Sequence, residues 1–181
     1  PDGNDVLGLL LAAQRDRSVS ERQVRNEVVT LIVAGHETVA ATLTWCLALL
    51  AGAPDQAARV RDEARALGPA GWSLESLAAL PVTRAVVDES LRLQPPAWLV
   101  SRRALAPDVL GGYAVPEGTV VIVSPPLVHR DPQLWPDPDR FDPDRFLGER
   151  RRDADRRGYL PFGAGPRLCI GRDLALLETV L

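Results

Sequence analysis

The stretch Phe162-Gly-Ala-Gly-Pro-Arg-Leu-Cys-Ile-Gly171 decides how this 181-residue sequence is interpreted. Cys169 stands just before a run of apolar residues at helical spacing, where unpaired backbone N–H groups and the helix dipole stabilise an anionic sulfur. Gly165 and Gly171 have no side chain, so a large flat group can approach the backbone there. Arg167 adds a cation two residues from the sulfur, suited to a carboxylate. We therefore predict a thiolate held ready for a metal with a bulky planar ligand.

The composition around this stretch is that of an ordinary globular protein. Hydrophobic residues make up 46% and charged residues 25%, which supports a packed core and excludes disordered or fibrous architectures. The 21 basic residues are all arginine and face 24 acidic residues, giving a net charge of −3. A slightly acidic chain is a poor candidate for nucleic-acid binding. Two cysteines cannot form a disulfide scaffold.

Helical periodicity dominates the sequence before residue 94. Ser20 and Gln23 form a capping-box signature, and the apolar spacing that follows predicts a helix over Glu21–Ala51, about 45 Å long. Its uncharged part, residues 38–54, is interrupted by threonines, a glycine and a proline. We interpret it as a buried core helix, and we predict no membrane segment.

The other predicted elements give a mainly α fold with small β-sheets. Helices are expected from Pro54 through about Leu67, from Pro81 through about Leu93, and from near Ile170 onward. Glycine and proline turn signals bound short strands at 113–115 and 119–124. A charged loop is expected over 148–158. The sequence lacks methionine and stops within its last predicted helix, so we expect a piece of a longer chain.

The segment 162–171 resembles the cysteine-ligand loop of the cytochrome P-450 family, whose pattern is F-x-x-G-x-R-x-C-x-G. Every specified position is filled. The alternative, that Cys169 is a small buried residue in a glycine-rich turn, requires five matches at fixed spacing by chance. The resemblance implies that Cys169 is the thiolate axial ligand of haem b, the ligation known for that family. It also implies cofactor-binding positions at Phe162, Gly165, Arg167 and Gly171.

A second segment, Ala34-Gly35-His36-Glu37-Thr38, resembles the family's oxygen-activation motif. In that role Gly35 leaves a gap beside the iron, while Thr38 and Glu37 pass protons to dioxygen. The alternative is that the Thr38 hydroxyl bonds back to the carbonyl of Ala34 and that Glu37 is simply solvated.

Glu89-Ser-Leu-Arg92 matches the family's E-x-x-R motif, and i,i+3 spacing places both side chains on one helix face. In the family a second arginine completes a buried structural network that holds the loop under the haem. Arg145 in Pro143-Asp144-Arg145-Phe146 is our candidate for it, although Pro138-Asp139-Arg140-Phe141 repeats the pattern. Asp144 stands where glutamate is more usual.

The remaining candidates carry weaker signals. Arg102 follows Pro95-Pro96 after five residues, the spacing of the family's propionate-binding arginine, and Arg103 beside it is a competitor. His129 and His36 could be metal ligands, but a structural turn and a helix position are the simpler interpretations. Cys46 is expected in the core, and Trp98 is expected to pack or to line a pocket.

The resemblance covers nearly the whole chain, from the long helix to the start of the last one. Residues 1–181 are interpreted as the C-terminal part of one haem-binding monooxygenase domain, truncated at both ends. It implies insertion of one atom of dioxygen into a small organic substrate, with electrons from NAD(P)H through a ferredoxin or flavoprotein reductase. Five arginines against three acids over 149–157 are a candidate docking patch for that donor, or simply a solvated loop. Alternative functions are peroxide-driven oxidation, isomerisation, dehydration, or a non-catalytic haem-binding fragment.

Arginine-only usage suggests a GC-rich bacterial source and a soluble cytoplasmic protein, with an anchor before residue 1 left open. We also expect that the 181 residues alone bind haem weakly or not at all.

Overall fold

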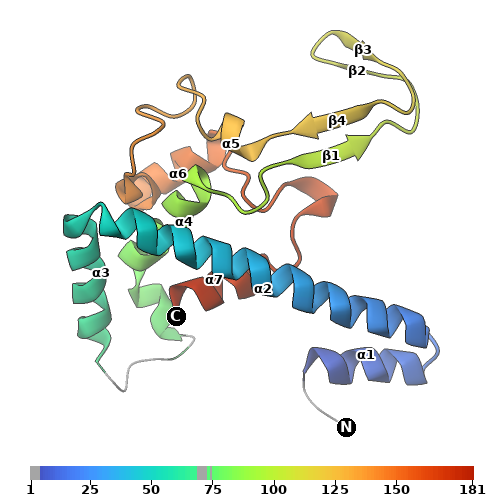
Figure 1. Ribbon diagram of the computed structural model, residues 1–181, viewed down its shortest axis with the longest axis horizontal. Helices are drawn as coiled ribbons and strands as arrows, with labels where there is room; N and C mark the ends of the chain where they lie inside the picture. The colour runs from blue at the N-terminus through green and yellow to red at the C-terminus, as the bar shows by residue number, and fades with distance from the viewer. Residues whose placement is uncertain (1–4, 69–72, 74) are drawn as a thin grey trace. The chain divides into compact units, whose positions relative to one another are not determined.

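The computed structural model describes residues 5–68, 73 and 75–181, so the opening residues 1–4 lie outside it. The chain forms two compact units, residues 1–40 and 41–181. The boundary falls inside the longest helix (Figure 1). Each unit is therefore described by itself.

The first unit contains α1 (Val6–Arg15) and the first part of α2 (Glu21–Ala51). α1 was not expected from the sequence. Asp5 caps it, because its side chain accepts the N–H of Gly8 at 2.7 Å. The predicted capping box opens α2, where the N–H of Ser20 donates to the side chain of Gln23 at 2.8 Å. The bounds predicted for α2 agree with the structure.

The long helix is more exposed than we predicted. Among its apolar side chains, Ile32 in the first unit is 64% exposed and Leu47 in the second is 67% exposed, whereas Val24 and Cys46 are buried. α2 is also long and apolar enough to cross a membrane, a test that core helices of soluble proteins pass as well. The expectation that residues 38–54 form a buried core helix was wrong, because among them only Thr42 and Cys46 are buried.

The second unit is built around α4 (Pro81–Leu93), whose residues 85–93 are all buried. Around it lie α3 (Pro54–Leu67), the short 3₁₀ helix η1 (Glu75–Ala79) and α7 (Arg172–Val180). A helix buried on every side is a core element. One apolar cluster joins α4 to the end of α2 and to α7, and it consists of Cys46, Leu80, Val87, Leu91, Leu176 and Val180.

A second apolar cluster lies on another side of α4. It joins that helix to η2 (Pro143–Phe146) and α6 (Gly148–Arg156) through Ala85, Trp135, Phe146 and Ala154. The short helix α5 (Pro125–Val128) precedes this region. Tyr159 packs against both clusters. It therefore marks the point at which the chain leaves the core for the cysteine-containing loop.

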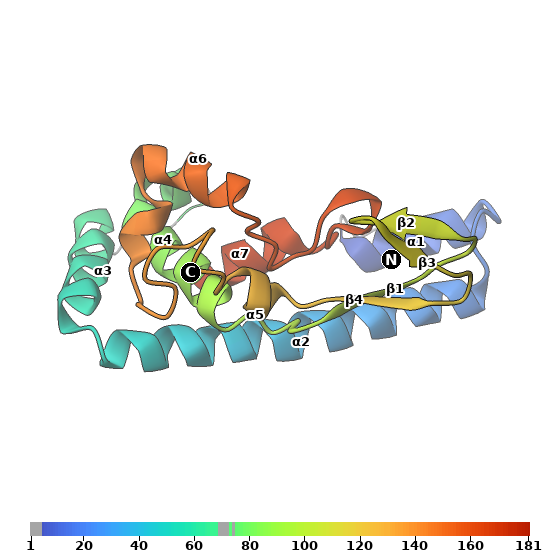
Figure 2. The same ribbon diagram turned by 90° about the horizontal axis from the view of Figure 1, so that it is seen from above.

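The strands form two antiparallel ribbons, one continuing into the other (Figures 1 and 2). β1 (Val100–Arg103) pairs with β4 (Val120–Val123), with Arg102 opposite Val121. β2 (Asp108–Leu110) pairs with β3 (Tyr113–Val115) across Gly111 and Gly112. Both glycines have positive φ, 57° and 86°, as a two-residue hairpin turn requires. β1 and β2 were not predicted.

One prediction in this unit is wrong: residues 148–158 are not a charged loop. Residues 148–156 form α6, which begins at Gly148 and is followed by Gly158, and both glycines have positive φ. Arginine, glutamate and alanine favour helix, and Ala154 is buried against the core. The glycines mark the ends of a helix rather than the ends of a loop.

Candidate functional site

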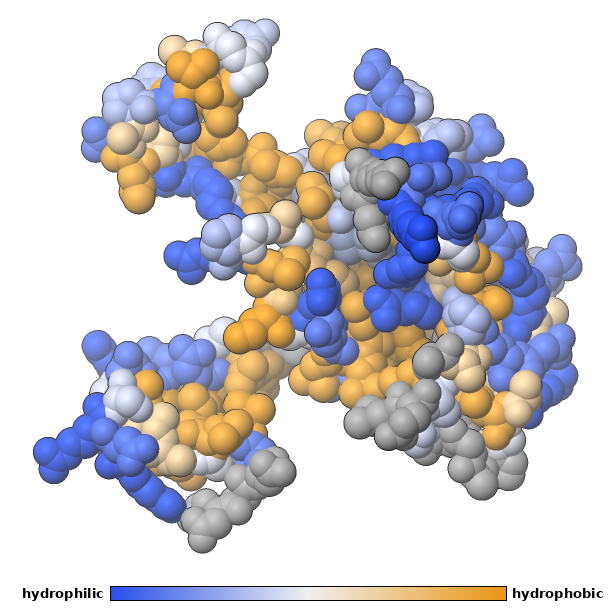
Figure 3. Space-filling model, turned by 180° about the vertical axis from the view of Figure 1, so that it is seen from behind, coloured by the Kyte–Doolittle hydropathy of each residue, from blue (hydrophilic) through white to orange (hydrophobic). Residues whose placement is uncertain are grey.

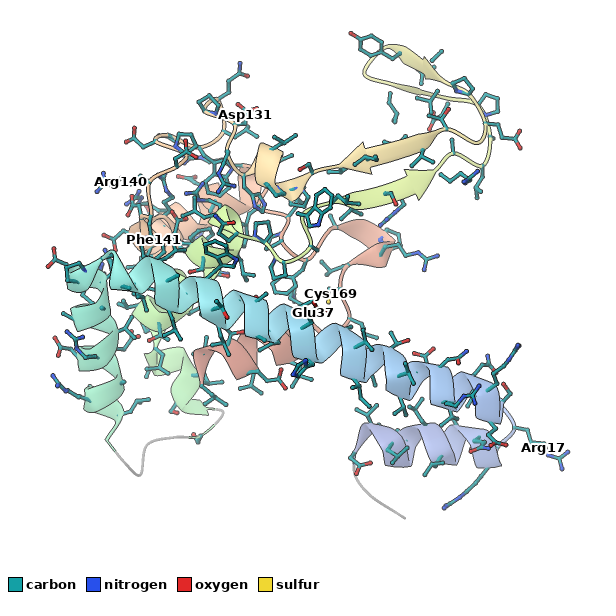
Figure 4. All side chains as sticks on the ribbon, viewed as in Figure 1. Arg17, Glu37, Asp131, Arg140, Phe141 and Cys169 are labelled. Atoms are coloured by element: carbon teal, nitrogen blue, oxygen red, sulfur yellow. The ribbon has the colours of Figure 1, made fainter. Side chains whose placement is uncertain are left out.

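The candidate site is the loop between Tyr159 and α7, which carries Cys169 (Figure 4). Phe162 is half-buried and packs against the first apolar cluster. Its carbonyl accepts the N–H of Cys169 at 3.0 Å. Between them lies the 3₁₀ turn η3 (Gly165–Arg167). One side of the loop is therefore anchored in the core, and the cysteine is held by its backbone.

The Cys169 thiol is exposed and in no disulfide. Gly165 has φ +69°, and a Cβ built there would meet nothing within 4 Å. At Gly171 a Cβ would lie 4.0 Å from the Cys169 Sγ. Gly165 is therefore surrounded by open space, and Gly171 lies beside the sulfur.

Exposed apolar side chains accompany this loop. Ile170, next to the cysteine, is 98% exposed, and Leu168 is also exposed. Exposed apolar residues elsewhere in residues 41–181 include Trp98, Leu99, Leu127 and Leu174. Figure 3 shows apolar patches reaching the molecular surface. A thiol between exposed apolar residues suits a ligand that is itself largely apolar.

The two arginines expected to bind propionates are exposed. Within the described residues, the Arg167 guanidinium makes no ion pair, and that of Arg102 donates only to the adjacent carbonyl of Ser101, at 2.8 Å. The β1–β4 register separates Arg102 from Arg103, because neighbouring residues of a strand point to opposite faces. Arg102 shares its face with Val100 and Val121, which are half-buried, whereas the face of Arg103 is exposed. Arg102 therefore lies on the more covered face of the ribbon.

On α4, Glu89 and Arg92 form a fully buried ion pair. The Arg92 guanidinium donates to both carboxylate oxygens of Glu89, at 2.7 and 2.8 Å. It also donates to the carbonyls of His129, Pro138 and Arg140, at 2.8, 2.7 and 3.1 Å. One arginine side chain thus ties α4 to the segment that follows α5.

Arg145 is the second arginine at this pair. Its Nε lies 3.5 Å from Glu89 Oε1, and its side chain is nearly buried. Its guanidinium also donates to the carbonyl of Asp137 at 2.9 Å. Arg140, the competing candidate, contributes its backbone carbonyl to Arg92. The geometry therefore places Arg145, rather than Arg140, beside Glu89.

Electrostatics show that this network is costly to bury. Burial raises the pKa of the Glu89 carboxyl above its ordinary value, although hydrogen bonds and the charge of Arg92 oppose that shift. Burial also lowers the pKa of Arg145, against the attraction of Glu89. Since charges removed from water repay their desolvation only partly, the network specifies a geometry more than it adds stability.

Asp88 is a functional-site neighbour that the sequence analysis missed. This buried carboxylate accepts from Arg84 at 3.0 Å, from Arg151 of α6, and from the Tyr159 hydroxyl at 3.1 Å. Burial raises the pKa of that hydroxyl. Arg150 of α6 is likewise bound, to Asp142 at 3.1 Å. Two arginines of the expected docking patch therefore make internal ion pairs.

His129 is fully buried and uses both ring nitrogens in hydrogen bonds. Nδ1 lies 3.0 Å from the carbonyl oxygen of Arg92, and Nε2 accepts the N–H of Leu160 at 2.8 Å. This leaves no nitrogen to bind a metal. In the described parts of the chain, no group of three or more histidine, cysteine and acidic side chains could hold a metal ion.

The residues of the proposed oxygen-activation motif lie in the first unit, on α2. Gly35, Glu37 and Thr38 are exposed. The Thr38 hydroxyl donates to the carbonyl of Ala34 at 2.6 Å, the bond that the alternative interpretation required. To donate a proton to a bound molecule, the hydroxyl would have to give up this intrahelical bond.

The exposed Cys169 thiol lies in a glycine-rich loop, and Glu89, Arg92 and Arg145 form a buried network in the same unit. A family model for cytochrome P450 matches residues 2–181. The chain is 43% identical to cyclooctat-9-en-7-ol 5-monooxygenase of Streptomyces melanosporofaciens over 99% of its length. It is 36% identical to pentalenene oxygenase of Streptomyces avermitilis over 98% of its length.

A solved structure agrees with these relatives. The crystal structure of the cytochrome P450DA heme domain superposes with a TM-score of 0.90 over 99% of this chain, at 36% identity. The chain therefore belongs to the cytochrome P450 family and has its fold, as the motifs predicted. It spans 40% of the length of each named relative and 41% of the solved chain.

Proposed function

We propose that this chain is the C-terminal, haem-binding part of a haem-thiolate monooxygenase, with Cys169 as the axial ligand. The observation that carries the proposal is the exposed Cys169 thiol in a loop where Gly165 has open space around it and Gly171 lies beside the sulfur. The relatives of this chain include proteins named as a monooxygenase and an oxygenase. When bound, haem b would supply the iron at which dioxygen is split between a small organic substrate and water.

The donor set of the chain fits this cofactor. A thiolate is a soft ligand suited to iron, and exposed Leu168 and Ile170 offer apolar contact to a porphyrin. Arg167 and Arg102 would bind the propionates by charge-assisted hydrogen bonds. The Glu89, Arg92 and Arg145 network would hold the loop in place without taking part in chemistry.

Gly35, Glu37 and Thr38 would serve the distal side of the same haem. Gly35 leaves room on the helix, Glu37 connects to solvent, and Thr38 orients water or donates a proton once its bond to Ala34 opens. Peroxide-driven oxidation, isomerisation and dehydration remain alternatives, since they need the same thiolate but not this proton path. A non-catalytic haem-binding fragment is a further one.

Electrons would come from a ferredoxin or flavoprotein reductase in a bacterial cytoplasm. Because Arg150 and Arg151 make internal ion pairs, α6 offers less free positive charge to such a donor than its sequence implied. Charge reversal at Arg152, which is exposed, tests the contact without breaking those pairs. An unchanged salt dependence of reduction would exclude a role of Arg152 in docking.

The ligand assignment is tested by joining these residues to the N-terminal portion of the Streptomyces melanosporofaciens relative, in place of its aligned segment. We expect the reduced carbon monoxide complex to show the thiolate-type Soret band, and Cys169→Ser to abolish it. Cys46→Ser is the matched control, because Cys46 is buried in the core, and it should keep the band. A thiolate-type band that survives in Cys169→Ser would overturn the proposal.

Two further comparisons sharpen this experiment. Arg102→Ala should weaken haem binding about tenfold, the loss of one charge-assisted contact, whereas Arg103→Ala on the opposite face should leave it unchanged. The 181 residues alone should bind added haem weakly or not at all. A stable thiolate-type spectrum from the chain alone would contradict that expectation while supporting Cys169 as ligand.

A further inference from the structure

His129 connects the buried network of α4 to the chain that leads into the Cys169 loop. Because the N–H of Leu160 can only donate, Nε2 of His129 must accept, at 2.8 Å. Nδ1 then carries the proton and donates to the carbonyl oxygen of Arg92, at 3.0 Å. Only the neutral Nδ1–H form of the ring makes both bonds.

The bonding between His129 and Arg92 is reciprocal. The Arg92 guanidinium donates to the backbone carbonyl of His129 at 2.8 Å, while the His129 ring donates to the backbone carbonyl of Arg92. Arg92 is in turn fixed by Glu89. The ring is therefore held in one orientation by the same ion pair that α4 buries.

The entrance to the loop is held at two consecutive residues. The Tyr159 hydroxyl lies 2.9 Å from the backbone carbonyl oxygen of Asp88 and 3.1 Å from its carboxylate, and the Tyr159 ring centroid lies 5.6 Å from that of His129. The N–H of Leu160 is bound by His129, and the carbonyl of Leu160 accepts the N–H of Gly163 at 3.1 Å.

The path from this anchor to the sulfur is short. Leu160 precedes Phe162 by two residues, and the Phe162 carbonyl accepts the N–H of Cys169 at 3.0 Å. A displacement of Leu160 therefore moves both the start of the loop and the backbone partner of the cysteine. In the described residues, no side chain other than His129 hydrogen-bonds the N–H of Leu160.

We propose that His129 is a positioning residue for Cys169, acting through the hydrogen bond from its ring to the N–H of Leu160. Its relevance to an axial ligand rests on the function proposed above. The positioning of the loop by His129 does not depend on a bound cofactor.

Two variants separate the two bonds of the ring. In His129→Asn the amide nitrogen can take the place of Nδ1 but nothing reaches Leu160, whereas in His129→Gln the amide oxygen can take the place of Nε2. Each variant keeps one of the two bonds, so their overall stabilities should be similar. The bond to Leu160 is kept in His129→Gln and lost in His129→Asn, whereas the bond to the Arg92 carbonyl is kept in His129→Asn and lost in His129→Gln.

Measurements on the 181-residue chain without haem read out the loop directly. We expect the Leu160 amide to exchange with deuterium about tenfold faster in His129→Asn than in His129→Gln, the effect of one lost hydrogen bond. Alkylation of Cys169, resolved from Cys46 by mass spectrometry, should change in His129→Asn alone. Equal exchange and equal alkylation in both variants would overturn the proposal.

Urea denaturation measures the overall stability of each variant, and exchange at a core amide distinguishes a local effect from global destabilisation. If His129→Asn is globally destabilised, exchange at Ala85 in the core of α4 should rise together with that at Leu160. Such parallel behaviour would also count against positioning. A local effect at Leu160 supports it whether or not haem binds, so failure of the proposed function is detected separately, by the spectra described above.

Discussion

The buried side of α4 and the Cys169 loop are neighbours along one path but are built in opposite ways. On α4, Asp88, Glu89 and Arg92 are almost fully inaccessible, and their charged groups are bound several times over. In the loop, residues 164–170 are all exposed, and the cysteine is held mainly by its backbone.

The difference distinguishes residues that hold the backbone in place from residues that are free to contact a ligand. A buried network can hold one geometry because each charged group would be costly to leave unpaired. A surface that receives a ligand must instead leave its side chains without internal partners. The polar contacts of this unit are therefore concentrated around α4, whereas the side chains of residues 164–170 are exposed.

Breaking the network should have the largest effect. Arg92→Ala leaves Glu89 as an unpaired buried carboxylate, and we expect the free energy of unfolding to fall by about 3–5 kcal/mol. Arg65→Ala is the matched control, because Arg65 pairs with Asp62 at 3.5 Å on an exposed helix face. That pair should contribute less than about 1 kcal/mol. Urea denaturation of both variants measures the contrast, and similar losses would show that the network is not what holds the fold.

Acidification should loosen the link between the two regions. Burial, with further contributions from the charges of Arg92 and Arg130, lowers the pKa of His129 from 6.5 to about 4, against the bond to the Arg92 carbonyl. The unfolded chain thus takes up the proton at a higher pH than the folded chain does. The contribution of neutral His129 to the free energy of unfolding is fully present above pH 6.5 and is lost as the pH falls toward 4.

The expected loss is on the order of 3 kcal/mol, at about 1.4 kcal/mol per pH unit. Subtracting the pH profile of His129→Gln removes the contribution of carboxylates that titrate in the same range. A difference between the two profiles that stays flat from pH 6.5 to 4 would show that His129 is not buried in its neutral form.

The loop should tolerate change more readily. At Gly165 an alanine would be held at φ +69° with open space around its Cβ, so Gly165→Ala should cost about 1 kcal/mol of backbone strain. At Gly171 the backbone has φ −86°, and Gly171→Ala should change stability by less than about 0.5 kcal/mol. Thermal unfolding compares the two, and equal effects would mean that the loop conformation does not require the left-handed glycine.

Much of this arrangement could be predicted from local signals. Helical periodicity and prolines gave the bounds of α2, α3 and α4, because these depend on residues close in sequence. The spacing of Glu89 and Arg92 placed both on one face, and glycines at 165 and 171 indicated an open loop. The helix α6 was mistaken for a loop because its flanking glycines resemble turn residues.

The contacts that join distant segments could not be predicted. Asp88 meets Arg151 and Tyr159 across more than sixty residues, and His129 meets Leu160 across thirty-one. No local periodicity encodes such pairs, since they depend on how α4 is packed. The first strand was also missed, because its register with β4 depends on a partner twenty residues away.

The mutual bonding of Arg92 and His129 has a consequence for laboratory evolution. Each residue satisfies a backbone oxygen of the other, so a library that randomises one position alone will mostly yield clones with a stranded donor or acceptor. We expect strong epistasis between the two sites, with tolerated combinations appearing only when both codons are varied together.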